Sequence, residues 1–281
     1  MFIEIINFII YSALIVLIAK YILVWSLRNL AEVLNLKPKT VGDIAGYATS
    51  TPEFLTITAS ALNGLISASI INVLSSNIIN LVQYFISIYL NNNQKAFRNK
   101  AIIVDIVLVI ITVLIPIVLI FFNIEISIFL VPFFVVLYFL FIFLNGNVHK
   151  LYLKKEDNLL ENNIKNESDK INNKPFKILL YVIYLILTGI LLFIIGNLLG
   201  TTLEVLCIKF SISQTIIGIL LGLITSIPEL ITFIESQKHY KKQTSNDILG
   251  VVEATNNLFT SNVLNLFVIQ TIGIIIFSIV S

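Results

Sequence analysis

Charged residues and cysteine are scarce in this sequence of 281 residues. Only 12% of the residues are charged, about half the share that is usual in soluble globular domains. The single cysteine, Cys207, excludes an internal disulfide and a cysteine-ligated metal site. No nucleophile–base pair, phosphate-binding loop or cofactor motif is present, so we expect neither an enzyme nor a bound cofactor. A net charge of +2 gives no reason to expect a nucleic-acid partner.

Hydrophobic residues make up 57% of the chain, and its mean hydropathy is +0.96. Apolar runs of 18 or more residues are typical of membrane-spanning helices. The first run has no basic segment before it and is too long for a signal peptide, so it is counted as a span. The sequence predicts an all-α polytopic membrane protein with about eight transmembrane helices, near residues 3–26, 40–62, 65–89, 101–122, 125–144, 176–199, 212–235 and 248–278.

Lysine and arginine are distributed unevenly between the predicted loops. Of the 18 basic residues, 16 fall in alternate loops, which by the positive-inside rule face the cytoplasm. This places the N-terminus outside, most simply in the plasma (cell) membrane. The polar stretch 145–175 is expected to be a flexible cytoplasmic linker between an N-terminal membrane half, 1–144, and a C-terminal half, 176–281.

Two polar stretches repeat within this apolar chain. "GYATSTPEFLTITAS", which begins at Gly46, matches "GLITSIPELITFIES", which begins at Gly222, and in each a glutamate follows a proline. A second block, "INVLSSNIINL", matches "NNLFTSNVLNL" further along. The matching polar pairs are Thr49/Thr225, Ser50/Ser226, Glu53/Glu229, Thr56/Thr232, Asn72/Asn257, Ser76/Ser261, Asn77/Asn262 and Asn80/Asn265.

The spacing of the copies predicts their orientation. Predicted helices 2 and 3 match helices 7 and 8, which lie five helices later. Because five is odd, the copies cross the membrane in opposite directions. Such an inverted-topology repeat is typical of secondary transporters, which bind substrate near the midplane between discontinuous helices.

The paired motifs supply the ligands that a hard cation needs. Proline has no N–H, so Pro52 and Pro228 leave the carbonyls of Ala48 and Ile224 without their helical partner. Intramembrane carboxylates are costly, which makes Glu53 and Glu229 functional candidates. Helical spacing places Thr49 and Ser50 on the face of Glu53, with Ser76 and Asn80 one turn apart on the next helix. Carboxylate, hydroxyl, amide and carbonyl oxygens together suit Ca²⁺ or Na⁺.

Several polar residues have two interpretations at this point. Thr56 and Thr232 either face ions or bond to their own helix backbone. Asn77 and Asn262 are either ligands or contacts between helices. Asp43 either stabilises its helix by lying at the positive end of the helix dipole or lines an ion vestibule. Glu253 is expected to reach the inner membrane interface rather than bind ions.

The paired segments resemble the alpha-repeats of the calcium/cation antiporter superfamily, which includes the sodium/calcium exchangers. The resemblance rests on "ATSTPE" and "ITSIPE", each followed by "SSNIIN" or "TSNVLN", and covers about 40–83 and 216–268. It implies four cation sites between helices 2, 3, 7 and 8, with Glu53 and Glu229 as central ligands. The other implied ligands are the carbonyls of Thr49 and Thr225, the hydroxyls of Ser50, Ser76, Ser226 and Ser261, and the amides of Asn80 and Asn265.

The chain departs from the family pattern in three places. Many members have an aspartate where this chain has Asn265, so the cluster holds two carboxylates instead of three. A glycine expected before the second-block serine is Ser75 in one copy and Thr260 in the other. Members usually have ten helices, and the predicted eight lack the last two.

The expected function is that of a secondary active antiporter that exchanges Ca²⁺ for Na⁺ by alternating access. The alternatives are an exchanger coupled to H⁺ or K⁺, and a transport-inactive truncated paralogue with a structural or regulatory role. The expected partners are the lipid bilayer and the transported inorganic cations.

Overall fold

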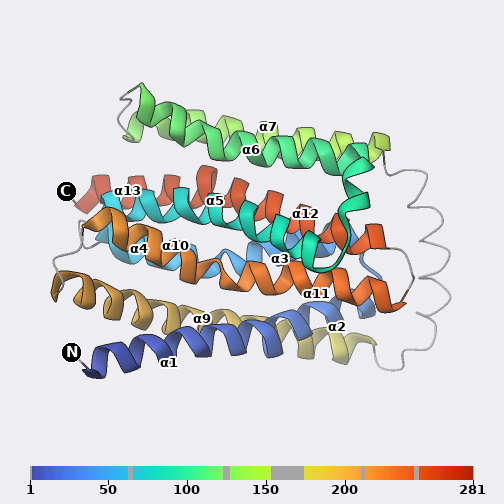
Figure 1. Ribbon diagram of the computed structural model, residues 1–281, viewed down its shortest axis with the longest axis horizontal. Helices are drawn as coiled ribbons and strands as arrows, with labels where there is room; N and C mark the ends of the chain where they lie inside the picture. The colour runs from blue at the N-terminus through green and yellow to red at the C-terminus, as the bar shows by residue number, and fades with distance from the viewer. Residues whose placement is uncertain are drawn as a thin grey trace.

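The computed structural model describes residues 2–62, 66–122, 127–152, 174–209, 213–243 and 247–280, and no strand occurs among them. The helices lie side by side along the length of a bundle (Figure 1). The helices of the N-terminal half are α1 (Phe2–Ile18), α2 (Val24–Leu34), α3 (Pro38–Thr49), α4 (Thr51–Leu62), α5 (Ile66–Leu90), α6 (Lys100–Phe121) and α7 (Val131–Tyr152). Those of the C-terminal half are α9 (Lys174–Lys209), α10 (Gln214–Thr225), α11 (Ile227–Gln243), α12 (Asp247–Leu264) and α13 (Gln270–Val280).

Shorter helical elements join some of these helices. The π-helical turn η1 (Ala19–Leu23) links α1 to α2, and η4 (Asn265–Ile269) links α12 to α13. The 3₁₀ elements η2 (Gln94–Arg98) and η3 (Ile128–Leu130) precede α6 and α7. Helix α7 runs beyond residue 144, where the linker was expected to begin, and most of that expected linker lies outside the described residues.

Six helical stretches in the described part of the chain are long and apolar enough to span a membrane. The first and second predicted spans are not among the six, and the first is represented by a shorter apolar stretch, Ile3–Ile15. The second is divided at Ser50 into α3 and α4, each of 12 residues. The fold class expected from the sequence is confirmed, and the interruption is what the paired Pro-Glu motifs predict.

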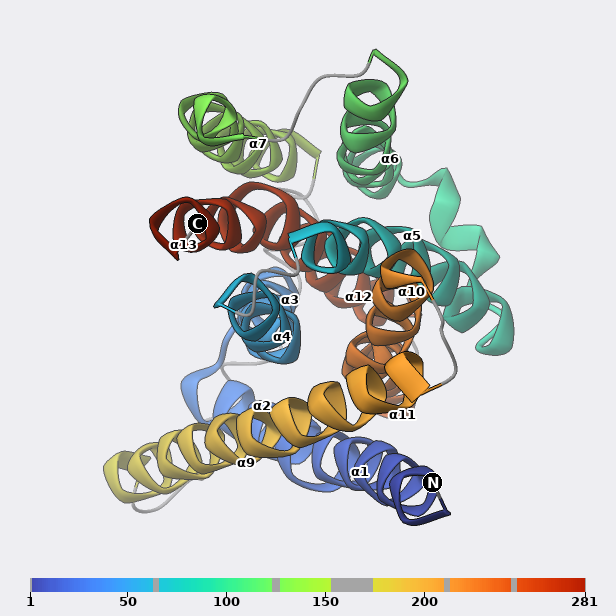
Figure 2. The same cartoon turned by 90° about the vertical axis from the view of Figure 1, so that its left-hand side faces the viewer.

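The bundle has three layers when viewed along its length (Figure 2). Helices α1, α2 and α9 form one side and pack on each other, and α6 and α7 form the opposite side. The two repeats lie between them. The first repeat, α3–α4 followed by α5, starts at the end away from the N-terminus, whereas the second, α10–α11 followed by α12–α13, starts at the end that holds it (Figure 1). The inverted topology is therefore confirmed.

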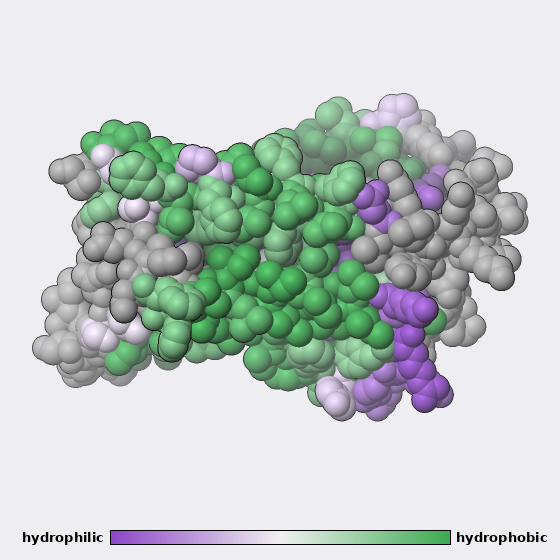
Figure 3. All heavy atoms as spheres, turned by 90° about the horizontal axis from the view of Figure 1, so that it is seen from above, coloured by the Kyte–Doolittle hydropathy of each residue, from purple (hydrophilic) through white to green (hydrophobic). Residues whose placement is uncertain are grey.

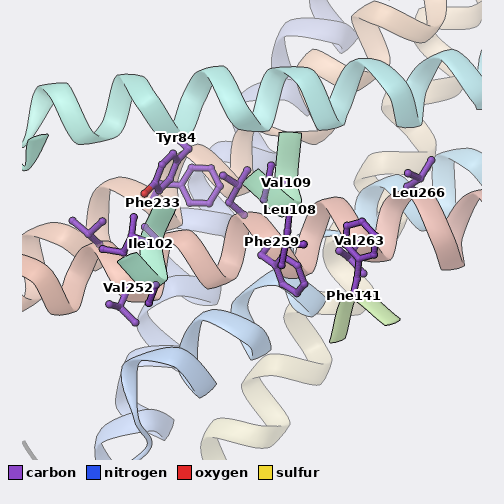
Figure 4. Close-up of a cluster of buried hydrophobic side chains, with 14 of the residues drawn as sticks. Tyr84, Ile102, Leu108, Val109, Phe141, Phe233, Val252, Phe259, Val263 and Leu266 are labelled. Carbon is purple, nitrogen blue, oxygen red and sulfur yellow. The ribbon is translucent and has the colours of Figure 1, made fainter. Parts of the chain in front are cut away.

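Apolar side chains fill the contact between the repeats and the α6–α7 layer. Tyr84 of α5, Phe233 of α11, and Phe259 and Val263 of α12 belong to one buried cluster (Figure 4). Two aromatic rings of α7 pack against Phe267: Phe134 is tilted with its centroid 6.0 Å away, and Phe141 is edge-to-face with its centroid 5.1 Å away. This cluster gives the polar centre a close-packed apolar wall.

The face shown in Figure 3 is apolar over the middle of the bundle. Large side chains such as Phe139 of α7 and Ile186 of α9 are 66% and 57% exposed, as expected for groups that face lipid. Hydrophilic residues gather toward the end that holds the loops before α3, α6 and α12. We call this the basic end of the bundle (Figure 3).

Glycines bring the repeats into close contact, with α3 packed on α12 and α10 packed on α5. A Cβ atom on Gly42 would lie 2.3 Å from the Glu253 carbonyl oxygen, and one on Gly46 would lie 2.8 Å from Cβ of Thr260. On the other side, a Cβ on Gly222 would lie 3.0 Å from the backbone nitrogen of Ser76. The second-block residues Ser75 and Thr260 thus fit because the facing helix supplies a glycine.

We expect Gly42→Ala to destabilise the protein by about 1–3 kcal/mol, the usual cost of forcing an extra methyl group into a packed core. The clash is with backbone, which has little freedom to move. Gly196→Ala in α9 is the matched control, because nothing lies within 4 Å of its added Cβ. Unfolding temperatures in one detergent compare the two variants. Equal stability would show that α3 and α12 do not pack this closely.

Candidate cation-binding site

Each repeat carries a helix break at the same position. Ser50 separates α3 from α4 with φ −78° and ψ 0°, and Ser226 separates α10 from α11 with φ −81° and ψ 0°. The next helix resumes immediately, so Glu53 and Glu229 lie in the first turns of α4 and α11. The positive end of a helix dipole favours a carboxylate there. Each break lies two residues before Pro52 or Pro228. Proline has no N–H to bond to the carbonyl four residues earlier, so the helix is interrupted in the turn that precedes the proline.

All ten residues predicted as ligands are buried. The exposed fraction is at most 2% for each of Thr49, Ser50, Glu53, Ser76, Asn80, Thr225, Ser226, Glu229, Ser261 and Asn265. The Glu53 carboxyl faces the side chains of Glu229 and Thr225, and the Glu229 carboxyl faces Thr49 and Ser261. Each carboxylate is therefore surrounded by groups of the opposite repeat or of the paired helix, as an interface site requires.

A chain of hydrogen bonds connects part of this set across the repeats. Ser50 Oγ donates to Ser261 Oγ at 2.9 Å, and Ser261 Oγ donates to Glu229 Oε1 at 3.2 Å. Asn80 Nδ2 lies 3.3 Å from Ser261 Oγ. Four elements, α3–α4, α5, α11 and α12, thus meet at Ser261.

Other oxygens of the set have no hydrogen-bond partner within the described residues. Both carboxylate oxygens of Glu53, Oε2 of Glu229, Oγ of Ser226, and Oδ1 of Asn80 and Asn265 are buried in this way. An unsatisfied buried polar group costs roughly 1–3 kcal/mol, more if it is charged. Buried oxygens of this kind suit a hard cation, which would satisfy several of them together.

The hydroxyls of Thr49 and Thr225 point back along their own helices. Thr49 Oγ1 donates to the Ala45 carbonyl at 2.9 Å, and Thr225 Oγ1 donates to the Leu221 carbonyl at 3.0 Å. This orientation is consistent with the expectation that the backbone carbonyls of these threonines, rather than their hydroxyls, are offered to ions.

Thr56 and Thr232 make equivalent hydrogen bonds to the backbone of the two glutamates. Thr56 Oγ1 donates to the Glu53 carbonyl at 3.0 Å and accepts from Asn72 Nδ2 at 2.8 Å. In the other repeat, Thr232 Oγ1 donates to the Glu229 carbonyl at 2.8 Å and accepts from Asn257 at 2.6 Å. The threonines thus bond to their own helix backbone. The role of the two asparagines was not predicted, although their match between the repeats was visible in the sequence.

Asn77 and Asn262 hold the two repeats together. Each donates its Nδ2 to the backbone carbonyl of the other at 3.1 Å. This is the contact between helices that was one of the two interpretations of the pair.

Glu253 is buried in an ion pair. Its side chain is 3% exposed and forms a two-pronged ion pair with Arg28 of α2, with N–O distances of 2.7 and 2.5 Å. The sequence did not predict this pair, because the arginine that offsets the burial of Glu253 is far away in the chain. Asp43 accepts a hydrogen bond from Thr260 Oγ1 at 3.0 Å, which joins α3 to α12.

The model of the family described as "Sodium/calcium exchanger protein" matches residues 5–146 and 180–280. The chain belongs to this family. It is therefore a membrane transporter of the cation-exchange type and not an enzyme. A search of curated protein sequences finds no match.

Solved structures of the sodium-calcium exchanger NCX_Mj share the fold. In crystals soaked with 10 mM Na⁺ and zero Ca²⁺, the TM-score is 0.59 at 22% identity, with 98% of this chain and 84% of that chain covered. In crystals soaked with 10 mM Na⁺ and 10 mM Sr²⁺, the TM-score is 0.60 at 20% identity, with 98% and 83% covered. At this identity the likeness establishes the arrangement of helices alone.

Proposed function

We propose that this family member exchanges Ca²⁺ for Na⁺ by alternating access, with the ions bound between α3–α4, α5, α10–α11 and α12. The observation that carries the proposal is the group of buried, unpartnered oxygens around Glu53 and Glu229. The proposed ligands are these carboxylates, the four serines Ser50, Ser76, Ser226 and Ser261, the amides Asn80 and Asn265, and the carbonyls of Thr49 and Thr225.

Charge explains how the two ions would be coupled. Two ionised carboxylates neutralise one Ca²⁺, and the same carboxylates would be shared among several Na⁺ ions. Because both kinds of ion need the same oxygens, the binding of one displaces the other. The gradient of Na⁺ then drives Ca²⁺ in the opposite direction without any other source of energy.

The direct test is uptake of ⁴⁵Ca²⁺ into proteoliposomes that contain the purified protein. An outward Na⁺ gradient should drive uptake, and equal Na⁺ on both sides should stop it. K⁺ and H⁺ gradients of the same size are the controls for the coupling ion. Uptake that follows the H⁺ or K⁺ gradient but ignores Na⁺ would contradict the proposed exchange.

We also propose that the basic end of the bundle faces the cytoplasm in the plasma membrane, where the segment 145–175 links the two halves. Leu62 ends α4 at the opposite end, and Lys238 lies near the basic end; both are exposed. In a Cys207→Ser background, an impermeant thiol reagent added outside intact cells should label Leu62→Cys and spare Lys238→Cys. The reverse pattern would invert the orientation, and labelling of both would contradict it.

A further inference from the structure

The two repeats match in sequence but differ in their hydrogen bonds at the cation site. Ser261 Oγ is turned into the site, where it bonds to Ser50 and Glu229. The Oγ of its counterpart Ser76 instead donates to Asn72 Oδ1, one turn earlier on its own helix, at 3.4 Å. One serine therefore bonds to a carboxylate, while the equivalent serine bonds to an asparagine of its own helix.

The asparagines at the site show the same asymmetry. Asn80 Nδ2 donates to Ser261 Oγ and to Asn262 Oδ1, each at 3.3 Å. Its counterpart Asn265 has no partner for Nδ2 or Oδ1 within the described residues. Asn77 Oδ1, which corresponds to Asn262 Oδ1, is also buried without a partner there.

If each residue of this network is replaced by its counterpart in the other repeat, a second, mirrored set of hydrogen bonds results. The bonds between Ser50 and Ser261 and between Ser261 and Glu229 become bonds from Ser226 to Ser76 and from Ser76 to Glu53. The two bonds of Asn80 become bonds from Asn265 to Ser76 and to Asn77. The bond between Ser76 and Asn72 becomes one between Ser261 and Asn257.

The second network would use atoms that have no partner in the first. These are Oγ of Ser226, the carboxylate oxygens of Glu53, Nδ2 of Asn265, Oδ1 of Asn77 and Oδ1 of Asn257, all buried and unpartnered within the described residues. The same side chains therefore support two mirror-related networks, of which the structure contains one. In inverted-repeat transporters the two repeats move against each other to change the side from which the site is reached.

We propose that Asn72 and Asn257 are positioning residues, each of which holds the serine hydroxyl one turn later out of the cation site. In this structure Asn72 holds Ser76 and Ser261 faces the site; on the opposite side of the exchange cycle, Asn257 holds Ser261 and Ser76 faces the site. The inference rests on the proposed function, because it assumes that the site is presented alternately to the two sides.

The hydrogen bonds to Thr56 and Thr232 explain why an asparagine suits this role. The Nδ2 of each asparagine is bound to a threonine, Thr56 or Thr232, at 2.8 and 2.6 Å. This bond fixes the amide, so its Oδ1 remains the acceptor for the serine at i+4. The threonine also donates to the carbonyl of Glu53 or Glu229. In the first repeat, the Ser76 hydroxyl is therefore connected to the Glu53 carbonyl through two side chains, Asn72 and Thr56.

The test compares Asn72→Ala with Asn257→Ala, which form a matched pair. Both variants lose the same bond to a threonine, so any effect of that bond is common to them. Asn72→Ala removes the acceptor used in the present network, and Asn257→Ala removes the acceptor used in the mirrored one. The ratio of the KM for Ca²⁺ at the two faces of oriented proteoliposomes should shift in opposite directions. We expect about a fivefold shift in each, the factor expected for one hydrogen bond.

A second measurement does not depend on transport. Hydrogen–deuterium exchange without Ca²⁺ or Na⁺ should change in opposite directions in the two variants, at the α4–α5 and α11–α12 junctions. Ser76→Ala should act like Asn257→Ala, and Ser261→Ala like Asn72→Ala. Shifts in one common direction, or none in the properly folded alanine variants, would overturn the inference. Opposite exchange shifts in a protein without Ca²⁺ flux would instead support the two networks and reject the proposed function.

Discussion

Replacing Glu53 or Glu229 with glutamine should abolish Ca²⁺ exchange and leave the protein folded in the membrane. The amide has nearly the same volume as the carboxylic acid, so the packing around these fully buried side chains is retained. The site, however, loses one of its two charges. A divalent cation that leaves water needs that charge, because neutral oxygens alone do not offset its dehydration. Flux of ⁴⁵Ca²⁺ should fall to the level of empty liposomes in each variant.

The matched control for these variants is Glu235→Gln on the same helix as Glu229. Glu235 is partly exposed and pairs with Lys238 at 3.6 Å, an arrangement that contributes little to stability. This variant should exchange Ca²⁺ at the normal rate. Near-normal flux in Glu53→Gln or Glu229→Gln would show that the ions bind elsewhere in the protein.

Truncating either member of the Arg28–Glu253 pair should produce the largest loss of stability. The two side chains are 13% and 3% exposed, and removal of one leaves the other charge buried without compensation. Such changes cost about 3–5 kcal/mol. Arg28→Ala and Glu253→Ala should therefore each unfold at a much lower temperature than the wild type in the same detergent.

The double variant Arg28→Ala/Glu253→Ala separates the effect of leaving a buried charge unpaired from the effect of losing side-chain packing. It should be more stable than the sum of the two single losses predicts, because no unpaired charge remains. Lys238→Ala removes one member of an exposed pair and should change stability by less than about 1 kcal/mol. Strictly additive losses in the double variant would mean that the two groups do not interact.

The helices and the pairing of motifs could be predicted because both depend on local sequence. Long apolar runs define the spans, and the repeated Pro-Glu motif defines the two helix breaks at Ser50 and Ser226. The burial of the ten predicted ligands follows from the cost of placing polar groups in lipid. Their direct coordination of ions stays a prediction.

The partners of isolated polar residues could not be predicted, because they lie far away in the sequence. Glu253 pairs with Arg28 across 225 positions, and nothing local distinguishes it from an acid at the interface. Asn72 and Asn257 illustrate a second limit. Their repetition was visible, but each can donate and accept, so only the structure shows which atom meets the threonine and which remains for the serine.

The contact between Asn77 and Asn262 has the geometry of a symmetric dimer. Each residue donates to the backbone carbonyl of its equivalent at the same distance, 3.1 Å, as in an isologous interface, where one surface meets a second copy of itself. A single repeat that carried this asparagine would already be complementary to another such repeat placed upside down beside it. The fold can therefore be understood as an antiparallel homodimer whose halves now share one chain. In a homodimer, one substitution would change both asparagines and remove both hydrogen bonds. In a single chain the two asparagines are free to diverge, and a substitution at one of them removes only one of the two bonds.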